Sequence, residues 1–501
     1  MCIRDRFSGM KHVLLLLSVL GCLSSVYGQK VDTTLISKQQ TAIFNRPTYG
    51  YSIKAPKTTD DNQDFQSLDI TSHAGDLADV LGDNIYNVDS LVVRGTVDDA
   101  DIHTLWDASL NGRLSVINLE NADIENGIIP EKAFWHQKEQ LDPSGEFINT
   151  IHLRRIILPN GVKRIEEMAF SYCVNLEETN IPSSLQYLGL DAFSDCVSLK
   201  TDPLVFPEGF ERFGKFVFSN CSSLKGQVVL PSTIKEIGDG CFFRSRISSI
   251  ILPEGLEKIG DVAFYACRLK EVWIPNSCQI ISGSTTFQQN YPLKKIHLPE
   301  GLEKIPDSFA SSCWNLQEVN IPSSVKTIGH DAFDRCVSLK KIELPDGLET
   351  IEWEAFCSCD SVEQIVFPAT LKQLGQESFC NIPELKRIYC MAEEPPVCEE
   401  STHHPGESPF GEYNSDSNSC TPNDIPVYVP MGTAEKYRKA WGWNYFTNFI
   451  ETNDFPTAIR NVTTEHTDSK SRIYDLNGRK VINPQKGQVY IKNGKKIIFT
   501  R

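Results

Sequence analysis

Most of this chain is short of positive charge, and the deficit excludes one large class of partners. Its 501 residues carry 49 Lys and Arg against 65 Asp and Glu, a formal net charge of −16 at pH 7. Proteins that bind nucleic acid need an excess of basic residues to neutralise phosphates. We therefore expect no nucleic-acid partner. The exception is the segment 470–501, where nine basic residues stand against one acid, Asp475, so a small basic module ends an acidic protein.

The sequence also lacks the short motifs that mark common active sites. It contains no G-x-S-x-G elbow, no H-E-x-x-H, no P-loop and no dinucleotide-binding glycine pattern. Its ten histidines are scattered and share no position in the repeat described below. We therefore predict that the protein is not an enzyme, has no catalytic residue and uses no cofactor.

Long apolar runs are missing except at the start of the chain. Val13 to Leu23 is almost wholly apolar, but this run is shorter than the ~20 residues that a transmembrane helix needs. We interpret residues 1–28 as a signal peptide cleaved before Gln29, with residues 1–9 extraneous to it. A lipoprotein cleaved before Cys22 is the alternative. No transmembrane segment is expected.

What the sequence has in abundance is one repeated phrase. Between residues 151 and 390 it returns to variants of ILPEGLEKIGDVAFYAC, with one proline every 22 to 25 residues. The prolines are Pro159, Pro182, Pro207, Pro231, Pro253, Pro275, Pro299, Pro322, Pro345 and Pro368. A phenylalanine follows each of them after ten to twelve residues: Phe170, Phe193, Phe218, Phe242, Phe264, Phe287, Phe309, Phe333, Phe356 and Phe379. Ten units in a constant register predict a stacked repeat.

Each unit predicts a short strand followed by a turn. Apolar and polar residues alternate before the proline, as in LKKIHL (293–298), which is the pattern of a strand with one buried face. Proline ends the strand, and the AF..C piece then buries an aromatic ring and a thiol. One unit cannot bury these groups alone, whereas stacked units share a continuous core. We predict a β-rich leucine-rich-repeat solenoid with a short strand plus a turn or short helix in each rung.

The repeated phrase resembles the BspA-type leucine-rich repeat, which occurs in surface proteins of anaerobic Gram-negative bacteria and some mucosal protozoa. The resemblance covers residues 151 to about 390. It implies an extracellular protein at the bacterial cell surface that acts as an adhesin or protein-interaction scaffold, with a host or bacterial protein as ligand. The alternative is a carbohydrate-binding surface protein that captures glycans.

The flanking segments complete the predicted order of domains. We expect a flexible leader over 29–72, N-terminal capping rungs over 73–150 with a helix from Asp98 to Leu110, and the ten-rung array over 151–390. A loop and C-terminal cap follow over 391–455. The cap contains a strand (425–430) and a short helix (433–440) with Thr433 near its start.

The end of the chain predicts a second, smaller unit. After a linker over 456–470, the basic segment 471–501 alternates like strands around Asn477-Gly478 and Asn493-Gly494, which are typical hairpin turns. Its phrases YDLNGRKV and GQVYIKNGKKI resemble the C-terminal sorting domain of the type IX secretion system. A small all-β stalk or anchor is the alternative.

The sixteen cysteines raise the question of disulfides in an exported chain. Six follow a rung phenylalanine by three residues: Cys173, Cys196, Cys221, Cys267, Cys336 and Cys359. Ser245, Asn290 and Ser312 stand three residues after other rung phenylalanines. Exchange with small polar residues favours free, buried thiols. Cys398 and Cys420 flank the variable loop of the cap and are left as disulfide candidates.

A zinc site in the same loop is not favoured. Its potential ligands are Cys390, Cys398, His403, His404 and Cys420. Structural zinc sites pair their ligands at closer spacing than Cys390 and Cys398. We expect no metal site.

The second residue before each proline should point outward from the strand. This column reads Ile157, Asn180, Val205, Val229, Ile251, Trp273, His297, Asn320, Glu343 and Val366, with Tyr389 in the last rung. Its apolar part, flanked by charged residues, is typical of an interaction surface, although strand propensity alone would also favour Val, Ile and Trp. We predict a binding patch of Val205, Val229, Ile251, Trp273, His297, Lys294, Lys295 and Tyr389.

Overall fold

The computed structural model describes residues 65–135, 151–400, 406, 408–411 and 420–456, and the backbone of three short strands near the C-terminus. The predicted signal peptide, almost all of the predicted leader, residues 136–150 and the linker beyond residue 456 lie outside the described residues. Among the helices that are described, none has the length and apolar character needed to cross a membrane.

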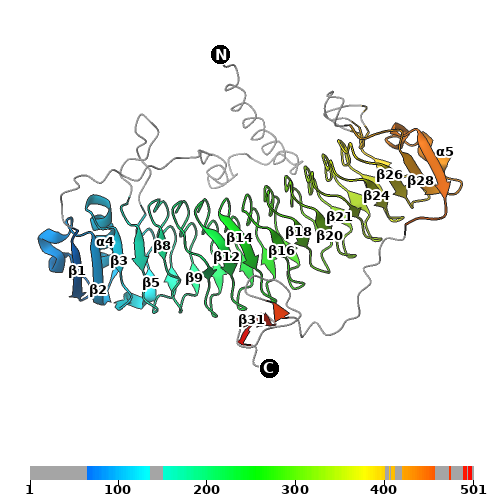
Figure 1. Cartoon of the computed structure of the whole chain (residues 1–501). Coiled ribbons are helices and arrows are strands. Elements are labelled where there is room, and N and C mark those ends of the chain that lie inside the picture. Colours follow the sequence, from blue (N-terminus) through cyan, green and yellow to red (C-terminus); the bar gives the residue numbers. More distant parts are fainter. Residues whose placement is uncertain are drawn as a thin grey trace, which may run out of the picture. The chain divides into compact units, whose positions relative to one another are not determined.

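Parallel strands stacked one per rung form what we call the front face of a solenoid (Figure 1). Sixteen strands contribute: β1 (Ser67–Ser72), β2 (Ser90–Val97), β3 (Val116–Asn118), β6 (Arg155–Ile157), β8 (Glu178–Thr179), β10 (Leu204–Val205), β12 (Lys225–Val229), β14 (Arg246–Ile251), β16 (Glu271–Trp273), β18 (Lys295–His297), β20 (Glu318–Asn320), β22 (Ile342–Glu343), β24 (Gln364–Phe367), β26 (Arg387–Cys390), β28 (Pro426–Pro430) and β29 (Asn448–Thr452). From β6 onward the strands of the array lie where the alternating segments before each proline predicted them. The predicted leucine-rich-repeat solenoid is confirmed.

A second column of two-residue strands, which we call the side face, follows the proline turns. It contains β5 (Ile128–Ile129), β7 (Arg164–Ile165), β9 (Tyr187–Leu188), β11 (Arg212–Phe213), β13 (Glu236–Ile237), β15 (Lys258–Ile259), β17 (Ile280–Ile281), β19 (Lys304–Ile305), β21 (Thr327–Ile328), β23 (Thr350–Ile351), β25 (Gln373–Leu374) and β27 (Val397–Cys398). Partners on adjacent rungs are parallel, as Lys258 with Ile280. The sequence predicted only a turn for this piece. A strand forms because its first residue faces outward while its second is buried in the shared core.

The turn that carries each phenylalanine is not a helix. In the rungs other than that of Phe309, residues two before and two after the ring adopt positive φ, as Met168 (55°) and Tyr172 (61°) do around Phe170. Their N–H groups donate to carbonyls of the next rung, Met168 to Leu190 and Tyr172 to Ser194. Hydrogen bonds between rungs thus satisfy backbone groups that a helix would satisfy internally. The sequence predicted a turn or a short helix in each rung, and across the described residues 151–390 every rung has the turn.

One file of aromatic rings runs through the core of the solenoid. The ten predicted phenylalanines are all at most 1% exposed. Centroids of neighbouring rings are 5.0 to 6.3 Å apart, and most pairs are nearly parallel. Phe134 and Phe410 extend the file at its two ends. The predicted single buried file of phenylalanines is confirmed.

Phe309 enters this file from a different backbone position. In regular rungs the phenylalanine N–H donates to the residue before the next phenylalanine, but here Phe287 donates to Phe309 O and Ala310 donates to Ala332 O. Ala310 therefore occupies the regular ring position, and Phe309 the preceding position, which is alanine in most rungs. The Phe309 ring consequently lies nearly perpendicular to its two neighbours, at 75° and 76°.

The same shift corrects the predicted equivalence of Ser312. Counting from Ala310, the residue in register with the other cysteines is Cys313. Its Sγ donates to Phe287 O at 3.2 Å, as the thiols of the other rungs do to preceding rungs. The count along the sequence failed because it started from Phe309, which stands one residue before the regular ring position that Ala310 occupies.

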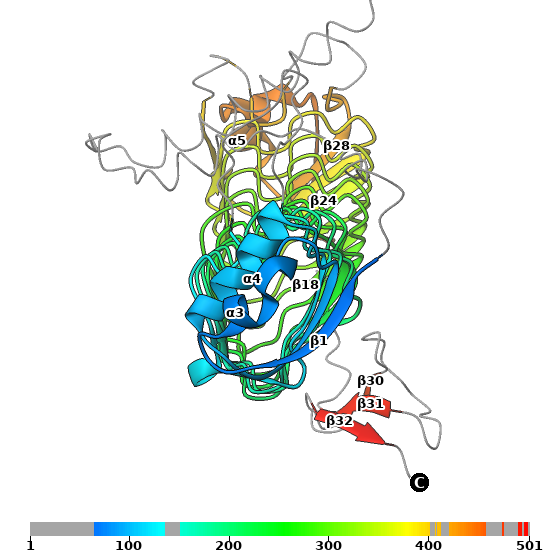
Figure 2. The same cartoon turned by 90° about the vertical axis from the view of Figure 1, so that its left-hand side faces the viewer.

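The N-terminal cap begins earlier than the sequence predicted. β1 starts at Ser67, inside the expected leader 29–72, and pairs with β2 along its whole length. The helices α3 (Leu77–Leu81) and α4 (Asp99–Asn111) lie across the rung from β1 (Figure 2), with 3-10 turns at Gly82–Asn84 and Glu125–Gly127 and a short strand β4 (Ala122–Ile124). The expected helix is α4, and Asp98 begins it with a capping box to Asp101.

The C-terminal cap contains the predicted strand and helix, with Thr433 at the helix N-cap as expected but without a capping bond from its side chain. α5 spans Ala434–Lys439, followed by a 3-10 turn at Trp443–Tyr445. The Thr433 hydroxyl donates to Pro430 O at 2.7 Å, so it does not accept a bond from the helix. Instead Glu451, from β29, accepts the Ala434 N–H at 3.0 Å. A carboxylate near a helix N-terminus is also stabilised by the helix dipole.

Three strands close the chain in a small antiparallel sheet. β30 (Ile473–Tyr474) pairs with β31 (Val489–Lys492), and β31 pairs with β32 (Lys495–Ile498). Asn493-Gly494 lies between β31 and β32, and both this dipeptide and Asn477-Gly478 are outside the described residues. The sorting or anchoring role of this segment stays a prediction.

Candidate functional site

The predicted outward column lies on the front face in the expected phase. In β16, Glu271 and Trp273 are exposed while Val272 between them is buried. Val205, Val229 and Ile251, on the preceding rungs, are half-buried, and their inward neighbours are buried. The register pairs Val205 with Val229 and Val229 with Ile251. These apolar side chains therefore form a continuous ridge that leads toward Trp273.

Trp273 is the most exposed member of this ridge, with 52% of its surface accessible. Its indole stacks on the imidazole of His297, with ring centroids 3.3 Å apart and an interplanar angle of 10°. Trp273 Nε1 donates to Glu271 Oε1 at 3.0 Å, and His297 Nε2 lies 3.4 Å from the same oxygen. Burial lowers the pKa of His297 below its ordinary value, so its ring is neutral at physiological pH. The indole is thus held in one orientation while its outer face stays open.

The two predicted lysines beside this stack differ in their surroundings. Lys295 pairs with Glu318 at 2.6 Å, and this contact raises the pKa of Lys295. Lys294 is exposed and forms no ion pair among the described residues. Lys294 is therefore a positive charge without an ion-pair partner among the described residues at the edge of the ridge.

Tyr389 belongs to a separate aromatic pair, of which the sequence predicted Tyr389 but not its partner. It stacks on Tyr428 of the C-terminal cap, with centroids 4.6 Å apart and an interplanar angle of 13°. The register continues the same outward column from Val366 through Tyr389 and Tyr428 to Ile450. Tyr428 was overlooked because it follows the irregular loop, although the strand-proline phrase IPVYVP holds the signal. The structure does not bring Tyr389 next to Trp273; several rungs separate them.

Family comparison agrees with the repeat seen in the fold. The BspA type leucine rich repeat region matches in six copies, over residues 143–255, 226–340 and 305–394. The chain belongs to the BspA-type leucine-rich repeat family. No curated protein matched the chain.

Several solved structures are similar to this BspA-type chain. A leucine-rich repeat protein from Bacteroides ovatus is 25% identical, with 56% of this chain and 79% of that chain covered and a TM-score of 0.38. A leucine rich cell surface protein from Faecalibacterium prausnitzii is 20% identical, with 61% and 80% covered and a TM-score of 0.35. The pneumococcal vaccine antigen PcpA is 20% identical, with 73% and 80% covered and a TM-score of 0.36.

The rung thiols of this BspA-type array form a structural ladder. Cys196 Sγ donates to Phe170 O and Cys221 Sγ to Phe193 O, both at 3.1 Å. Asn290 takes the same role with its amide, which donates to Phe264 O at 2.7 Å. Burial raises the pKa of these thiols far above its ordinary value, so they are neutral and unreactive. The prediction of unoxidised, buried thiols is confirmed for the described rungs.

The disulfide considered for the cap is not formed. Cys398 and Cys420 are both present as thiols. Cys390, also named as a possible zinc ligand, is buried and accepts a hydrogen bond from the Tyr437 hydroxyl at 3.2 Å. His403 and His404 lie outside the described residues.

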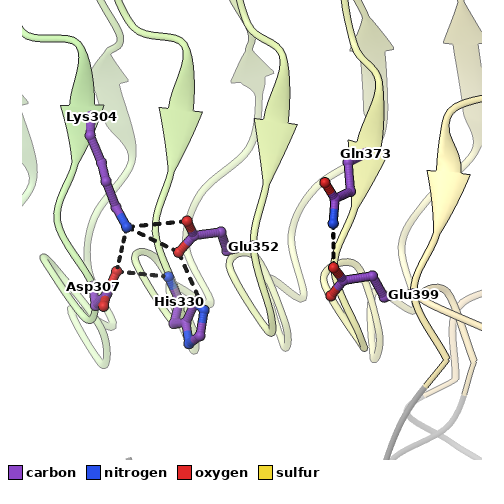
Figure 3. Close-up of polar contacts among 6 residues, drawn as sticks. All are labelled: Lys304, Asp307, His330, Glu352, Gln373 and Glu399. Carbon is purple, nitrogen blue, oxygen red and sulfur yellow. Dashed lines mark hydrogen bonds and ion pairs between the residues drawn. The ribbon is translucent and has the colours of Figure 1, made fainter. Parts of the chain in front are cut away.

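A polar cluster on the side face has donors suited to a metal but already contains a cation. Asp307, His330 and Glu352 hold ligand atoms within 4.8 Å of one another. Lys304 Nζ lies between the two carboxylates, 3.3 Å from Asp307 Oδ1 and 3.1 Å from Glu352 Oε1 (Figure 3). The same view shows the next contact along this face, between Gln373 and Glu399. Because the ammonium balances the carboxylates, this cluster is best described as an ion-pair network that ties adjacent rungs.

A second side-face feature lies near the N-terminal end of the array. The guanidinium carbons of Arg164 and Arg212 lie 4.3 and 5.0 Å from the ring centroid of Tyr187, which they enclose. Together with Gln186 and Glu211 they line an open hollow of about 400 Å³. Cation–π contacts of this kind order the two arginines on the surface. This feature was not predicted from the sequence, because the two arginines and Tyr187 belong to three different rungs.

Proposed function

We propose that this protein is an exported surface adhesin or interaction scaffold that binds an extracellular protein through the front face of its solenoid. The observation that carries the proposal is Trp273, which is half exposed yet held rigidly by His297 and Glu271. Tryptophan is the residue most enriched at binding hot spots. A rotamer fixed before binding reduces the entropy lost when the partner arrives.

The surroundings of Trp273 support the same proposal. The half-buried ridge from Val205 to Ile251 gives an apolar contact line, and Lys294 at its edge supplies a free charge. Repeat proteins use such extended surfaces because stacking brings equivalent side chains into register. One line of four side chains is shorter than a standard interface, so it forms part of a broader site.

The test is ligand capture by the full exported chain on an array of extracellular host and bacterial-surface proteins. Trp273→Ala should weaken capture by ~2 kcal/mol or more, a loss of about thirtyfold, while the unfolding midpoint stays within experimental error. Trp314→Ala is the matched control, because Trp314 is 49% exposed but packs on Tyr291 away from the outward column. Lys294→Glu should mainly slow association and change its dependence on salt.

Two outcomes would contradict the proposal. Equal loss of capture in the Trp273 and Trp314 variants would show a nonspecific effect of removing a surface indole. Normal capture by Trp273→Ala would show that the ridge reflects strand propensity alone and that the ligand binds elsewhere.

Carbohydrate capture is the second candidate, and the tyrosine pair favours it. Tyr389 and Tyr428 are half-buried and stack on the same column, next to Ile450, which is exposed. Sugar-binding surfaces commonly use several aromatic rings on one exposed face. Parallel incubation of the same variants on a glycan array separates the two functions, since glycan capture should depend on Tyr428 and protein capture on Trp273.

A further inference from the structure

Three consecutive rungs near the C-terminal end of the array depart from the usual composition of the phenylalanine turn. Their sequences are DAFDRC (331–336), EAFCSC (354–359) and ESFCNI (377–382). The residue two before the ring is acidic in all three, and the residue after it is Asp334, Cys357 or Cys380. In the rungs from 168 to 196 the latter position is serine. Stacking therefore gathers acids and thiols from three rungs at one place.

The side chains at this place converge. Ligand atoms of Asp334, Glu354 and Cys357 all lie within 4.8 Å of one another. The thiols of Cys357 and Cys380, on adjacent rungs, share a hydrogen bond. Asp334 and Cys357 are each 4% exposed and Cys380 is fully buried, whereas Glu354 is half-buried and reaches the surface. The cluster is thus almost wholly buried, and only Glu354 reaches the surface.

The cluster contains a carboxylate oxygen that lacks a partner. Asp334 Oδ2 lies 3.4 Å from Arg335 Nη1, but the buried Oδ1 accepts no hydrogen bond. Leaving a buried anionic oxygen unpaired is costly, so such groups in native proteins call for an explanation. Consistent with this imbalance, burial raises the pKa of Asp334 to about 7, and burial followed by repulsion from Asp331 raises the pKa of Glu354.

We propose that Asp334, Glu354, Cys357 and Cys380 form a binding site for a thiophilic divalent cation of the Zn²⁺ type. Asp334, Glu354 and Cys357 already hold ligand atoms close together, and Cys380, hydrogen-bonded to Cys357, would complete the four ligands that zinc takes in tetrahedral sites. Calcium and magnesium are disfavoured, because both select oxygen ligands. On binding, each coordinating thiol loses its proton to solvent and becomes a thiolate. The cation supplies the partner that Asp334 Oδ1 lacks.

The site differs from the Lys304 cluster in where the nearest basic side chain lies, which decides whether a metal ion has room to bind. There an ammonium lies between the two carboxylates, whereas here the Arg335 guanidinium lies 3.4 Å from Asp334 Oδ2 and Asp334 Oδ1 accepts no hydrogen bond. The proposal is also independent of the front face, so it stands or falls separately from the proposed adhesin function. Metal here would tie three rungs together at the point where the regular array approaches its cap.

The experiment titrates the full, reduced chain with Co²⁺ as a spectroscopic substitute for zinc. We expect one equivalent to produce a sulfur-to-cobalt charge-transfer band that Zn²⁺ abolishes. Cys357→Ser with Cys380→Ser should eliminate the band. Cys267→Ser is the matched control, because Cys267 is equally buried but bonds only to Ser245, Phe242 and Tyr265 in the ladder. Its titration should be unchanged.

A second readout does not depend on the thiols. Asp334→Asn with Glu354→Gln keeps the shape of both side chains, so this variant should fold while its cobalt affinity falls at least tenfold. Zn²⁺ should raise the unfolding midpoint of the parent chain and not that of this variant. Absence of a thiolate band in the parent chain, a band that survives in the double cysteine variant, or a Cys357–Cys380 disulfide in the protein isolated without reductant would each overturn the proposal.

Discussion

Replacing Phe264 with alanine tests the physical basis of the stack. The Phe264 ring is fully buried and nearly parallel to Phe242 at 5.8 Å and to Phe287 at 5.3 Å. Removal of a buried phenylalanine costs about 3–5 kcal/mol through lost burial and the cavity that remains. Each aromatic pair contributes a further ~0.5–1.5 kcal/mol, which places the expected loss near the upper end of that range.

The position of Phe264 in the stack adds a second expectation. Each rung of a solenoid contacts only its neighbours, so a weakened central rung separates two groups of rungs. Denaturant unfolding of Phe264→Ala, followed by circular dichroism, should therefore show an earlier and broader transition than the parent chain. The control is Ile280→Ala, because Ile280 is 53% exposed and its loss should change stability by no more than about 0.5 kcal/mol.

A clear result would refute the reasoning. If Phe264→Ala lowers the free energy of unfolding by less than about 1 kcal/mol, the ring file is not what holds the rungs together. If both variants lose similar stability, general sensitivity of the array and not the buried ring would explain the effect.

Two further predictions concern positions where the fold departs from the simple repeat. Phe309→Ala alone should lower the free energy of unfolding by ~3–5 kcal/mol. The double variant Phe309→Ala with Ala310→Phe should stay within about 1.5 kcal/mol of the parent chain, because it returns the ring to its regular position. Equal losses of stability in the two variants, measured by urea unfolding, would contradict the shifted register. Glu451→Gln should remove an acid-sensitive part of the stability of the cap. Hydrogen bonds from Ala434 and Gly432 hold the pKa of Glu451 below its ordinary value of 4.5, so its stabilisation is complete above that pH and is lost as the pH falls through the lower folded-state pKa. Thermal unfolding between about pH 3 and 6 should show this acid limb in the parent chain and a flatter one in the variant, and identical limbs would rule out the role of Glu451.

The repeated phrase alone was enough to predict the fold and the outward column. Alternation before each proline decides which strand residues are buried, and it placed Val272 inside and Trp273 outside. The constant interval to the phenylalanine predicted the ring file. These features could be predicted because each depends on local periodicity, which repeats ten times and leaves no competing register.

Other features depend on which residues meet after the rungs are stacked. The exchanged roles of Phe309 and Ala310, the cap of α5 by Glu451 and the pairing of Tyr389 with Tyr428 all follow from hydrogen-bonded register between separate segments. The expectation of no metal site rested on ligand spacing along the chain. It did not consider the cluster around Asp334, whose members come from adjacent rungs, so that Asp334 is 20 residues before Glu354 in sequence but close to it in space.

One physical cause explains why some features could be predicted from the sequence and others were seen only in the structure. Periodic burial of apolar side chains is a property of each rung, so the sequence by itself determined the solenoid, its core and its exposed face. Contacts across rungs depend on the exact length of every turn, because one residue more or fewer shifts which side chains lie against each other. Only the tertiary structure therefore decided that Trp273 rests on His297, that Ala310 takes the position of a ring, and that acids and thiols from three rungs meet in one cluster.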